Sequence, residues 1–242
     1  AALREGYERF DPRAYLRNNY LPPRADFSSE EFVVPWKLRC LAETFASGEI
    51  RGRTLIDVGS GPTIYQLLSA CDHFEEIVAT DYLAVNREEL GRGHEGGTGG
   101  CRGTPEGGRC WGDPGRIVSP SPTGSQPHVP VGFCPQISWD HSPMFLQMAV
   151  SPDRAAFVRA LAHVGNLLRP GGHALLLGAL GESFYLAGPA RLPVVPLEES
   201  DVREALAAAG FALRELRSYV MPPALRTGVD DVDGVFFAPA QQ

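Results

Sequence analysis

Apolar side chains recur at helical spacing in two segments near the start of the chain. Residues 11–20, DPRAYLRNNY, begin with Asp11, which suits a helix N-cap, and Pro12, which suits the first helical position. Residues 34–46, VPWKLRCLAETFA, carry an apolar stripe on one face, and Gly48 follows as a stop signal. Both segments are therefore predicted helices. The side chains that we expect the second helix to bury are Trp36, Leu38, Leu41 and Phe45.

The pattern then changes to short apolar runs. Residues 54–58, TLIDV, predict a buried strand, and the glycine-rich turn that follows leads into a predicted helix over about 62–71. Residues 75–81, EEIVATD, predict a second short strand that ends on an acid. A strand, a helix and a strand at this spacing form a βαβ unit, so we expect the two strands to be parallel.

The last third of the chain returns to clear periodicity. We expect a helix over 151–168, a strand over 173–180, a helix over about 198–209, and two β-prone runs over 211–221 and 234–240. Ser151 is the expected N-cap of the first helix, with Pro152 at its first position. The two final runs are expected to pair as an antiparallel hairpin at the sheet edge.

Residues 92–146 fit neither period. The stretch 91–115 holds eleven of the chain's 27 glycines, and prolines are frequent in the residues that follow. Such a composition buries too little apolar surface to offset the entropy of ordering the chain. We therefore expect a mostly irregular or disordered segment that supplies no strand and leaves the sheet incomplete beside 76–81 and 173–180. The composition favours a translated non-coding or out-of-frame stretch over an evolved loop.

Composition and charge narrow the class of protein. The 242 residues carry a net charge of −7 without a basic block, and 43% are hydrophobic, which is ordinary for a globular chain. We therefore expect no nucleic-acid or membrane partner. The first ten residues lack both the apolar core of a signal peptide and an initial Met, so a truncated or processed chain is expected.

Cysteine and histidine indicate neither a disulfide framework nor a metal site. The five cysteines are an odd number without a C-x-x-C pair. His73, His163 and His173 show no metal-ligand spacing, and we interpret them as structural. We therefore expect no metal and a reducing, cytoplasmic compartment.

The turn after the first predicted strand is the strongest candidate for a binding site. Gly59 and Gly61 let a ligand approach the backbone, and Asp57 is placed to orient the turn. Asp81 ends the next strand at the distance where an acid meets a ribose in nucleotide-binding βαβ units. A tight turn without a ligand is the alternative for the glycines alone. The strand before, the helix after and the acid in register favour a ligand that contains adenosine.

The pattern D-x-G-x-G selects among adenosine-containing cofactors. Ile64 stands where a dinucleotide site requires its third glycine, and no Lys follows to hold phosphates as in a P-loop. S-adenosylmethionine carries no phosphate. It needs an acid for the ribose and small residues beneath its methionine portion, so it is the cofactor that we predict.

Six longer runs resemble the amine N-methyltransferase family that includes the phenylethanolamine, nicotinamide and indolethylamine enzymes. They read FDPRAYLRNNYLPPR, VVPWKLRCLA, LIDVGSGPTIYQLLSA, LLRPGGHALLLGAL, ESFYLAGPARLPVVP and MPPALRTGVDDVDGVFFA. The resemblance covers 1–91 and 149–242. It implies an α/β fold of class I, S-adenosylmethionine-dependent type: a Rossmann-like, mostly parallel seven-stranded sheet, a C-terminal antiparallel hairpin and an N-terminal helical lid.

The resemblance also implies roles for individual residues. Glu182 and Asp230 would be the catalytic acids, which hold the amine and the side-chain hydroxyl of a phenylethanolamine. Cofactor contacts are implied for Tyr7, Tyr15, Tyr20, Gly59, Ser60, Gly61, Thr63, Tyr65, Asp81 and Asn86. Substrate contacts are implied for Asn19, Arg24, Val33, Lys37, Phe145, Tyr185, Met221 and Val232.

The residues themselves leave simpler alternatives open. The three N-terminal tyrosines are at near-helical spacing, where packing of a docked helix is the usual role. Glu182 begins a loop, where a solvated acid is common, and Asp230 with Asp231 has the pattern of a turn cap. The position of Glu182 after a strand supports a functional role, since ligands of open α/β sheets bind beyond the carboxyl ends of the strands.

The resemblance fails in the centre of the chain. From residue 92 to about 148 the family pattern is absent, including a third strand and an acid for the adenine side of the cofactor. The run MFLQM (144–148) stands where the family has its fourth strand. Phe145 matches an aromatic residue that packs on the substrate ring, whereas Met148 replaces an acid implicated in amine handling.

The resulting expectation is one methyltransferase domain over 1–242. It divides into a lid over 1–50, a cofactor-binding half over 54–91, an irregular segment over 92–148 and a C-terminal half over 149–242. The implied reaction is N-methylation of a phenylethanolamine, of the noradrenaline-to-adrenaline type, by a cytoplasmic monomer. The alternatives are another arylalkylamine or pyridine N-methyltransferase, or a methyltransferase-like protein impaired by its central segment.

Overall fold

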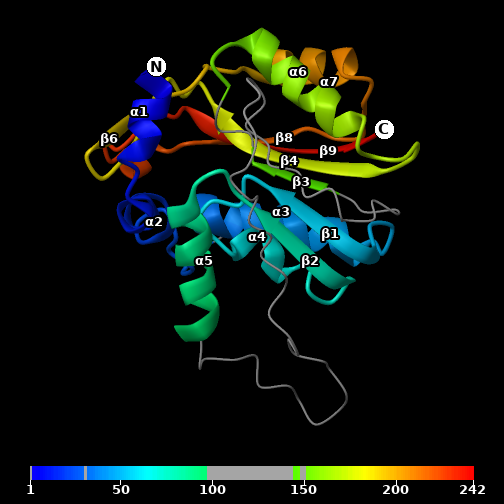
Figure 1. Ribbon diagram of the computed structural model, residues 1–242, viewed down its shortest axis with the longest axis horizontal. Helices are drawn as coiled ribbons and strands as arrows, with labels where there is room; N and C mark the ends of the chain where they lie inside the picture. Colours follow the sequence, from blue (N-terminus) through cyan, green and yellow to red (C-terminus); the bar gives the residue numbers. More distant parts are fainter. Residues whose placement is uncertain (1, 30–31, 97–143, 148–150) are drawn as a thin grey trace, which may run out of the picture.

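A seven-stranded sheet is the centre of the computed structural model, which describes residues 2–29, 32–96, 144–147 and 151–242 (Figure 1). The strand order is β2-β1-β3-β4-β9-β7, and β8 also pairs with β9. β1 to β4 are parallel, whereas β7, β8 and β9 are antiparallel to their neighbours. The strands are β1 (Gly52–Val58), β2 (Phe74–Thr80), β3 (Met144–Gln147), β4 (His173–Leu180), β7 (Ala212–Leu213), β8 (Arg217–Val220) and β9 (Gly234–Gln241).

Helices cover both faces of this sheet. α3 packs through one hydrophobic cluster, and α6 with α7 packs through another on the opposite face (Figure 1). The described helices are α1 (Ala2–Glu8), α2 (Pro12–Tyr20), α3 (Val33–Ala46), α4 (Tyr65–Leu68), α5 (Ala84–Gly96), α6 (Arg154–Gly165), α7 (Glu199–Ala208) and the 3₁₀ helix η1 (Pro223–Leu225). The expected mostly parallel, Rossmann-like sheet with antiparallel C-terminal strands is confirmed.

The apolar run of β4 shows why this layering follows from the sequence. Leu175 and Leu177 face the α3 side, and Ala174 and Leu176 face the side of α6 and α7. Successive side chains of a strand point to opposite faces, so a strand covered on both sides must be apolar throughout. The unbroken run of residues 173–180 is thus the signature of a central strand.

The N-terminal helices form largely as predicted. Asp11 caps α2, since its Oδ1 accepts hydrogen bonds from the N–H groups of Arg13 at 2.9 Å and Ala14 at 3.1 Å. α3 buries Trp36, Leu41 and Phe45, whereas Leu38 is only partly buried. α1 precedes them and was not predicted.

The helix expected over 62–71 is wrong in length, because α4 contains only four residues. Side-chain and i→i+3 hydrogen bonds replace the helical ladder at both of its ends. The Thr63 hydroxyl donates to the carbonyl of Ser60 at 3.1 Å, and the Ala70 N–H donates to the carbonyl of Leu67 at 3.0 Å. The turn therefore keeps its own geometry instead of continuing as a helix.

The start of α6 also differs from the prediction. Asp153, not Ser151, is its N-cap, and the Asp153 Oδ1 accepts a hydrogen bond from the Ala156 N–H at 2.7 Å. Both residue types suit an N-cap, and the one nearer the first helical turn takes the position. Ser151 remains buried just outside the helix, with 8% of its surface exposed.

The expectation that residues 92–146 supply no strand is wrong at its C-terminal end. β3 pairs in parallel with both β1 and β4, and it buries Met144 and Leu146 completely. The sheet is therefore filled beside 173–180. Residues 92–96 are also helical, as the last part of α5. The expectations for residues 97–143, and for the side chain of Met148, lie outside the described residues.

A small second sheet was not predicted. β5 (Phe184–Ala187) and β6 (Ala190–Pro193) form an antiparallel hairpin, and α1 and α2 pack against it. The two C-terminal β-prone runs do pair antiparallel, but the first is split into β7 and β8. Within the described ranges, no helix combines the length and the apolar character that a membrane crossing requires. The division of one domain into four segments stays a prediction.

Candidate active site

The turn after β1 is fixed against the end of β2. The N–H groups of Gly59 and Ser60 both donate to the carbonyl oxygen of Thr80, each at 2.9 Å. Gly59 and Gly61 have φ angles of 74° and 62°, which side chains with a Cβ rarely adopt. The turn thus lies at the carboxyl ends of two parallel strands, where open α/β sheets bind ligands.

Gln66 holds this turn from the inside, a role that the sequence analysis missed. Its Nε2 donates to Asp57 Oδ2 at 2.8 Å and to the carbonyl oxygens of Thr63 at 3.0 Å and Ser60 at 3.2 Å. The Thr63 hydroxyl donates in return to Gln66 Oε1 at 3.0 Å. Gln66 has no exposed surface, so a single buried amide ties the strand end to both sides of the turn.

Asp81 is fixed in the same region by three donors. Its Oδ2 accepts from the Gly61 N–H at 2.8 Å, and its Oδ1 accepts from the Leu83 N–H at 2.8 Å and from Asn86 Nδ2 at 3.1 Å. Burial raises the pKa of Asp81 although these hydrogen bonds oppose the change. A carboxylate offers about four lone-pair positions, so Oδ2 can still accept from a further donor such as a ribose hydroxyl.

Two buried oxygens beside this turn fit a polar ligand. Asn86 Oδ1 and Asp57 Oδ1 have no hydrogen-bond partner among the residues that the structure describes. Burial raises the pKa of Asp57 to about 6. Buried polar atoms are almost always paired, so atoms left open next to a glycine turn indicate a place for donor groups of a ligand. The residues present therefore fit an adenosine-containing cofactor.

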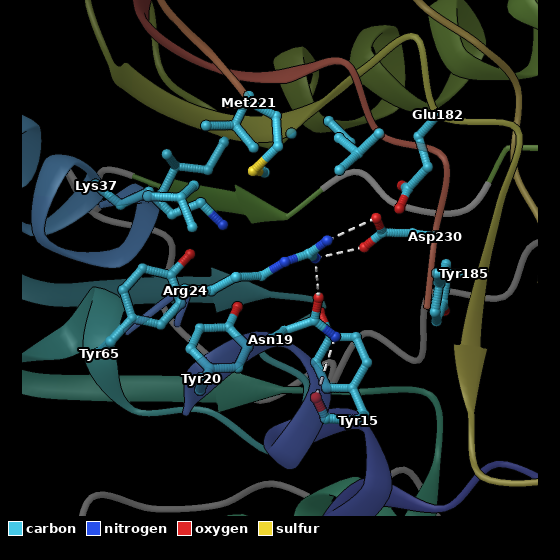
Figure 2. A pocket seen from close by; sticks show the side chains of 16 residues that line it. Tyr15, Asn19, Tyr20, Arg24, Lys37, Tyr65, Glu182, Tyr185, Met221 and Asp230 are labelled. Atoms are coloured by element: carbon cyan, nitrogen blue, oxygen red, sulfur yellow. Dashed lines mark hydrogen bonds and ion pairs between the residues drawn. The ribbon is translucent and has the colours of Figure 1, made fainter. Parts of the chain in front are cut away.

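A cavity of about 100 Å³ is lined in part by Tyr65, the first residue of the helix α4 that follows the turn (Figure 2). The two predicted catalytic acids, Glu182 and Asp230, both line it. The predicted substrate residues that line it are Asn19, Arg24, Val33, Lys37, Tyr185, Met221 and Val232. Tyr15, Tyr20 and Tyr65 from the predicted cofactor set line it as well. The lining residues that were not predicted are Leu177, Gly178, Ala179 and Val235.

A buried ion pair crosses the cavity wall. Arg24 donates to both carboxylate oxygens of Asp230, at 2.5 and 2.8 Å, and each side chain is 3% exposed (Figure 2). The same guanidinium donates to Asn19 Oδ1 at 3.0 Å and to the carbonyl oxygen of Leu225 at 3.2 Å. Asp230 is therefore not the free turn cap that its sequence allowed, but part of the cavity.

Glu182 is the acid whose carboxyl stays open to the cavity. No hydrogen bond or ion pair engages that carboxyl within the described part of the chain. Burial, and then the negative charges of Asp230 and Asp231, raise its pKa to about 8, against the opposite effect of Lys37 and Arg24. A carboxyl with a pKa near the working pH is well suited to accept a proton.

Lys37 projects toward the aromatic side of the cavity. Its Nζ lies 5.9 Å from the centre of the Tyr20 ring and 5.6 Å from that of Tyr65, within the range of cation–π contacts. Burial lowers its pKa to about 8, although Glu182 and Asp230 favour its charged form. The rings of Tyr15, Tyr20 and Tyr65 follow one another at 6.0 and 5.2 Å, so packing and a binding role coincide in these tyrosines.

Two predicted site residues remain, Tyr7 and Phe145. Tyr7 lies on α1 and meets the ring of Tyr82 edge-on, with centroids 6.5 Å apart. Phe145 contributes its backbone to β3, and its side chain lies outside what the structure describes, as does Met148. Among the described residues, no group of three or more His, Cys, Asp or Glu could hold a metal ion.

Comparison with known proteins extends the sequence resemblance. The sequence profile of the NNMT/PNMT/TEMT family matches residues 1–95 and 125–242. Phenylethanolamine N-methyltransferase of Homo sapiens is 53% identical over 264 residues, which cover 100% of this chain and 92% of that protein. Nicotinamide N-methyltransferase of Homo sapiens is 34% identical over 221 residues, which cover 84% of this chain and 83% of that protein.

The profile match corrects the limits of the central segment. It includes 125–148, which the sequence analysis placed outside the family pattern, so the part without a match is 96–124. Magnesium protoporphyrin IX methyltransferase from Synechocystis PCC 6803, solved with bound SAH, gives a TM-score of 0.56 at 11% identity, over 95% of this chain and 93% of that one. That likeness concerns the fold alone, and it confirms the expected methyltransferase fold.

Removing one partner of the buried ion pair should destabilise the protein more than removing both. We expect Arg24→Met to lower the free energy of unfolding by about 3–5 kcal/mol, because Asp230 is left buried and unpaired. The double variant Arg24→Met/Asp230→Leu should recover most of that loss. Urea unfolding followed by circular dichroism measures both.

The pair of Arg13 and Glu89 gives the control, since the Arg13 side chain is 63% exposed and Glu89 keeps Arg92 as a partner when Arg13 is removed. Arg13→Met should cost less than about 1 kcal/mol. Equal losses in the free energy of unfolding for Arg24→Met and for the double variant would show that an unpaired Asp230 is not the cause of the destabilisation.

Proposed function

The chain belongs to the NNMT/PNMT/TEMT family, and we propose that it transfers a methyl group from S-adenosylmethionine to the amine of a phenylethanolamine. The observation that carries this proposal is the 53% identity with phenylethanolamine N-methyltransferase along the whole chain. The cavity supports it, because it combines two acids with aromatic walls, and its lining residue Tyr65 begins the short helix that follows the glycine turn.

The cofactor is held at the turn and at the end of β2. Asp81 accepts the ribose hydroxyls, and the glycines of the turn allow the methionine portion to approach the backbone. Asn86 Oδ1 and Asp57 Oδ1 are open to donors of the ligand. When bound, the cofactor supplies an activated methyl group, so the residues around it have to position a nucleophile and handle one proton.

Glu182 acts on the amine. An alkylamine reaches the site as an ammonium ion, whose lone pair is blocked by a proton. The ionised carboxyl of Glu182 attracts this ammonium and accepts the proton, which leaves a neutral amine with a free lone pair. Most of the remaining rate enhancement comes from holding that lone pair in line with the methyl group.

Asp230 accepts a hydrogen bond from the side-chain hydroxyl of the phenylethanolamine. Its two oxygens accept from Arg24, and the ion pair fixes the orientation of the carboxylate. A carboxylate that accepts two hydrogen bonds has lone pairs left for a third donor, such as the hydroxyl of a phenylethanolamine. The aromatic ring then lies among the apolar and aromatic side chains of the cavity, which include Met221 and Val232.

The alternatives are separated by assay. A pyridine or another arylalkylamine substrate would have no hydroxyl for Asp230 to bind, so turnover of nicotinamide or of tryptamine above that of phenylethanolamine would favour them. An impaired methyltransferase-like protein would bind cofactor without turnover. Against impairment stands β3, which completes the sheet between β1 and β4.

The cytoplasmic location and the monomeric state belong to the same proposal. Cys40 and Cys71, the cysteines that the structure describes, form no disulfide there, which supports a reducing compartment. Sedimentation analysis tests the oligomeric state.

Replacing Asp81 should weaken cofactor binding. Asp81→Ala removes charge-assisted hydrogen bonds worth about 1.5–3 kcal/mol each, so we expect the Kd for S-adenosylmethionine to rise at least about tenfold. Titration calorimetry well below the melting temperature measures it. Glu88→Ala removes a charge from α5, the helix that follows Asp81, where the Glu88 side chain is 63% exposed, and should leave Kd unchanged. Unaltered affinity in Asp81→Ala would reject the ribose assignment.

Replacing Glu182 should remove the base. We expect Glu182→Gln to lower kcat by about 10²–10⁴-fold, since an amide cannot accept the proton. In the unmodified protein kcat/KM for the amine should rise with pH until about pH 8, because this parameter reports the free protein, where the raised pKa of Glu182 keeps the carboxyl protonated below that value. Glu182→Gln should lack this rise, whereas the exposed control Glu204→Gln should retain it. A normal profile in Glu182→Gln would place the base elsewhere.

Replacing Asp230 should change substrate preference. In Asp230→Ala the ratio of kcat/KM for phenylethanolamine to that for phenylethylamine should fall about tenfold, the size of one hydrogen bond to a charged group. The ratio is independent of how much protein is folded, so the broken ion pair does not obscure it. Glu182→Gln should slow both amines equally and leave the ratio unchanged. An unchanged ratio in Asp230→Ala would mean that another group reads the hydroxyl.

A further inference from the structure

A second, smaller cavity lies behind Glu182. Its volume is about 20 Å³, and it shares Ala179 and Glu182 with the main cavity. Its remaining wall consists of Ser151, Phe157, Val194, Val195 and Leu197. Glu182 therefore borders both spaces, one that would hold the substrate and one too small for it.

Ser151 and Glu182 are the polar side chains that line the small cavity among the described residues. Ser151 is buried, and neither its hydroxyl nor the Glu182 carboxyl makes a hydrogen bond to any residue within the described ranges. The Ser151 hydroxyl is not used as a helix cap, because Asp153 caps α6. Buried polar groups without protein partners are normally bridged by water.

The size and lining of the cavity fit one water molecule. A water requires about 10–15 Å³ of such space and two or more polar partners. The 20 Å³ available admits one water and not two, and the hydroxyl and the carboxyl supply the partners. Phe157 and Leu197, 1% and 4% exposed, close the apolar part of the wall.

We propose that Ser151 is a positioning residue for Glu182: through one water in this cavity it donates a hydrogen bond to the Glu182 carboxylate and favours the ionised form that accepts the proton of the amine. This inference rests on the proposed function, since it concerns the same acid. A hydrogen bond to the charged form of a carboxyl lowers its pKa. Ser151 thus acts against the burial that raises the pKa of Glu182.

The other groups that act on Glu182 do not offer this contact. Asp230 and Asp231 repel its charge, and Lys37 and Arg24 attract it from the side of the main cavity. Tyr15 and Tyr185 also lie within electrostatic range of it. Among the described residues, Ser151 is the polar side chain that approaches Glu182 from the second cavity, so its effect can be removed without altering a residue of the main cavity.

The experiment compares the unmodified protein with Ser151→Ala by carbon-13 NMR titration of labelled glutamate carboxyls, with the Glu182 signal assigned from Glu182→Gln. We expect the pKa of Glu182 to rise by about one unit in Ser151→Ala, the size of one lost hydrogen bond to a charged group. Ser218→Ala, at an exposed serine, should leave it unchanged. An unchanged pKa in Ser151→Ala overturns the proposal, whether or not the protein is active.

Kinetics separate this inference from the proposed function. In Ser151→Ala the rise of kcat/KM for the amine with pH should move upward by the same unit. The variant should therefore lose about tenfold in kcat/KM at pH values below the pKa and little above it, with KM for S-adenosylmethionine unchanged. A shifted NMR titration without any methyl transfer would reject the proposed function and keep the positioning role. Methyl transfer with an unshifted titration and an unshifted pH profile would keep the proposed function and reject the positioning role of Ser151.

Discussion

The ion pair between Arg24 and Asp230 is the contact on which the rest of the site depends. It joins the segment between α2 and α3 to the residues before β9, across 206 positions of sequence. Two charges that are each 3% exposed are expensive to desolvate, and the pair is tolerable because the remaining donors of Arg24 reach Asn19 and the carbonyl of Leu225. It adds a buried polar connection to the packing of α1 and α2 against the β5–β6 hairpin and of α3 against the sheet.

Local patterns were sufficient for much of the frame. The run from 54 to 81 predicted parallel strands around a glycine turn, and 173–180 predicted a central strand. These predictions were possible because a strand that is buried on both faces is apolar at consecutive positions. The same holds for Asp11, whose capping bonds join it to Arg13 and Ala14, two and three residues away. The resemblance to a known family then assigned residues such as Asn19 and Met221 to one site, and both line the cavity. Periodicity could not do this, because it carries no information about contacts between distant segments.

What the sequence could not predict depends on partners far along the chain or on side chains that replace backbone bonds. Nothing near Arg24 or Asp230 indicates the other. Gln66 looks like an ordinary helical residue until its amide is seen to bind Asp57, Ser60 and Thr63, which also explains why α4 is so short. β3 was hidden because its four residues end a stretch whose composition argued for disorder, and Met144 and Leu146 find their burial only between β1 and β4.

The same burial that makes Glu182 a suitable base also costs stability. Its pKa is raised from 4.5 to about 8, so between those values the unfolded chain releases the proton first and stability falls as pH rises. Lys37 acts in the opposite sense: its pKa is lowered from 10.5 to about 8, so its charge is penalised below pH 8 and stability recovers as pH rises from about 8 to 10.5. Near neutral pH Lys37 is largely held in the charged form, which burial disfavours, whereas Glu182 is largely held in the neutral form because burial penalises its carboxylate. An ammonium ion beside Glu182 would relieve this penalty, because it stabilises the carboxylate. The electrostatics of the cavity therefore favour a cationic amine independently of shape complementarity.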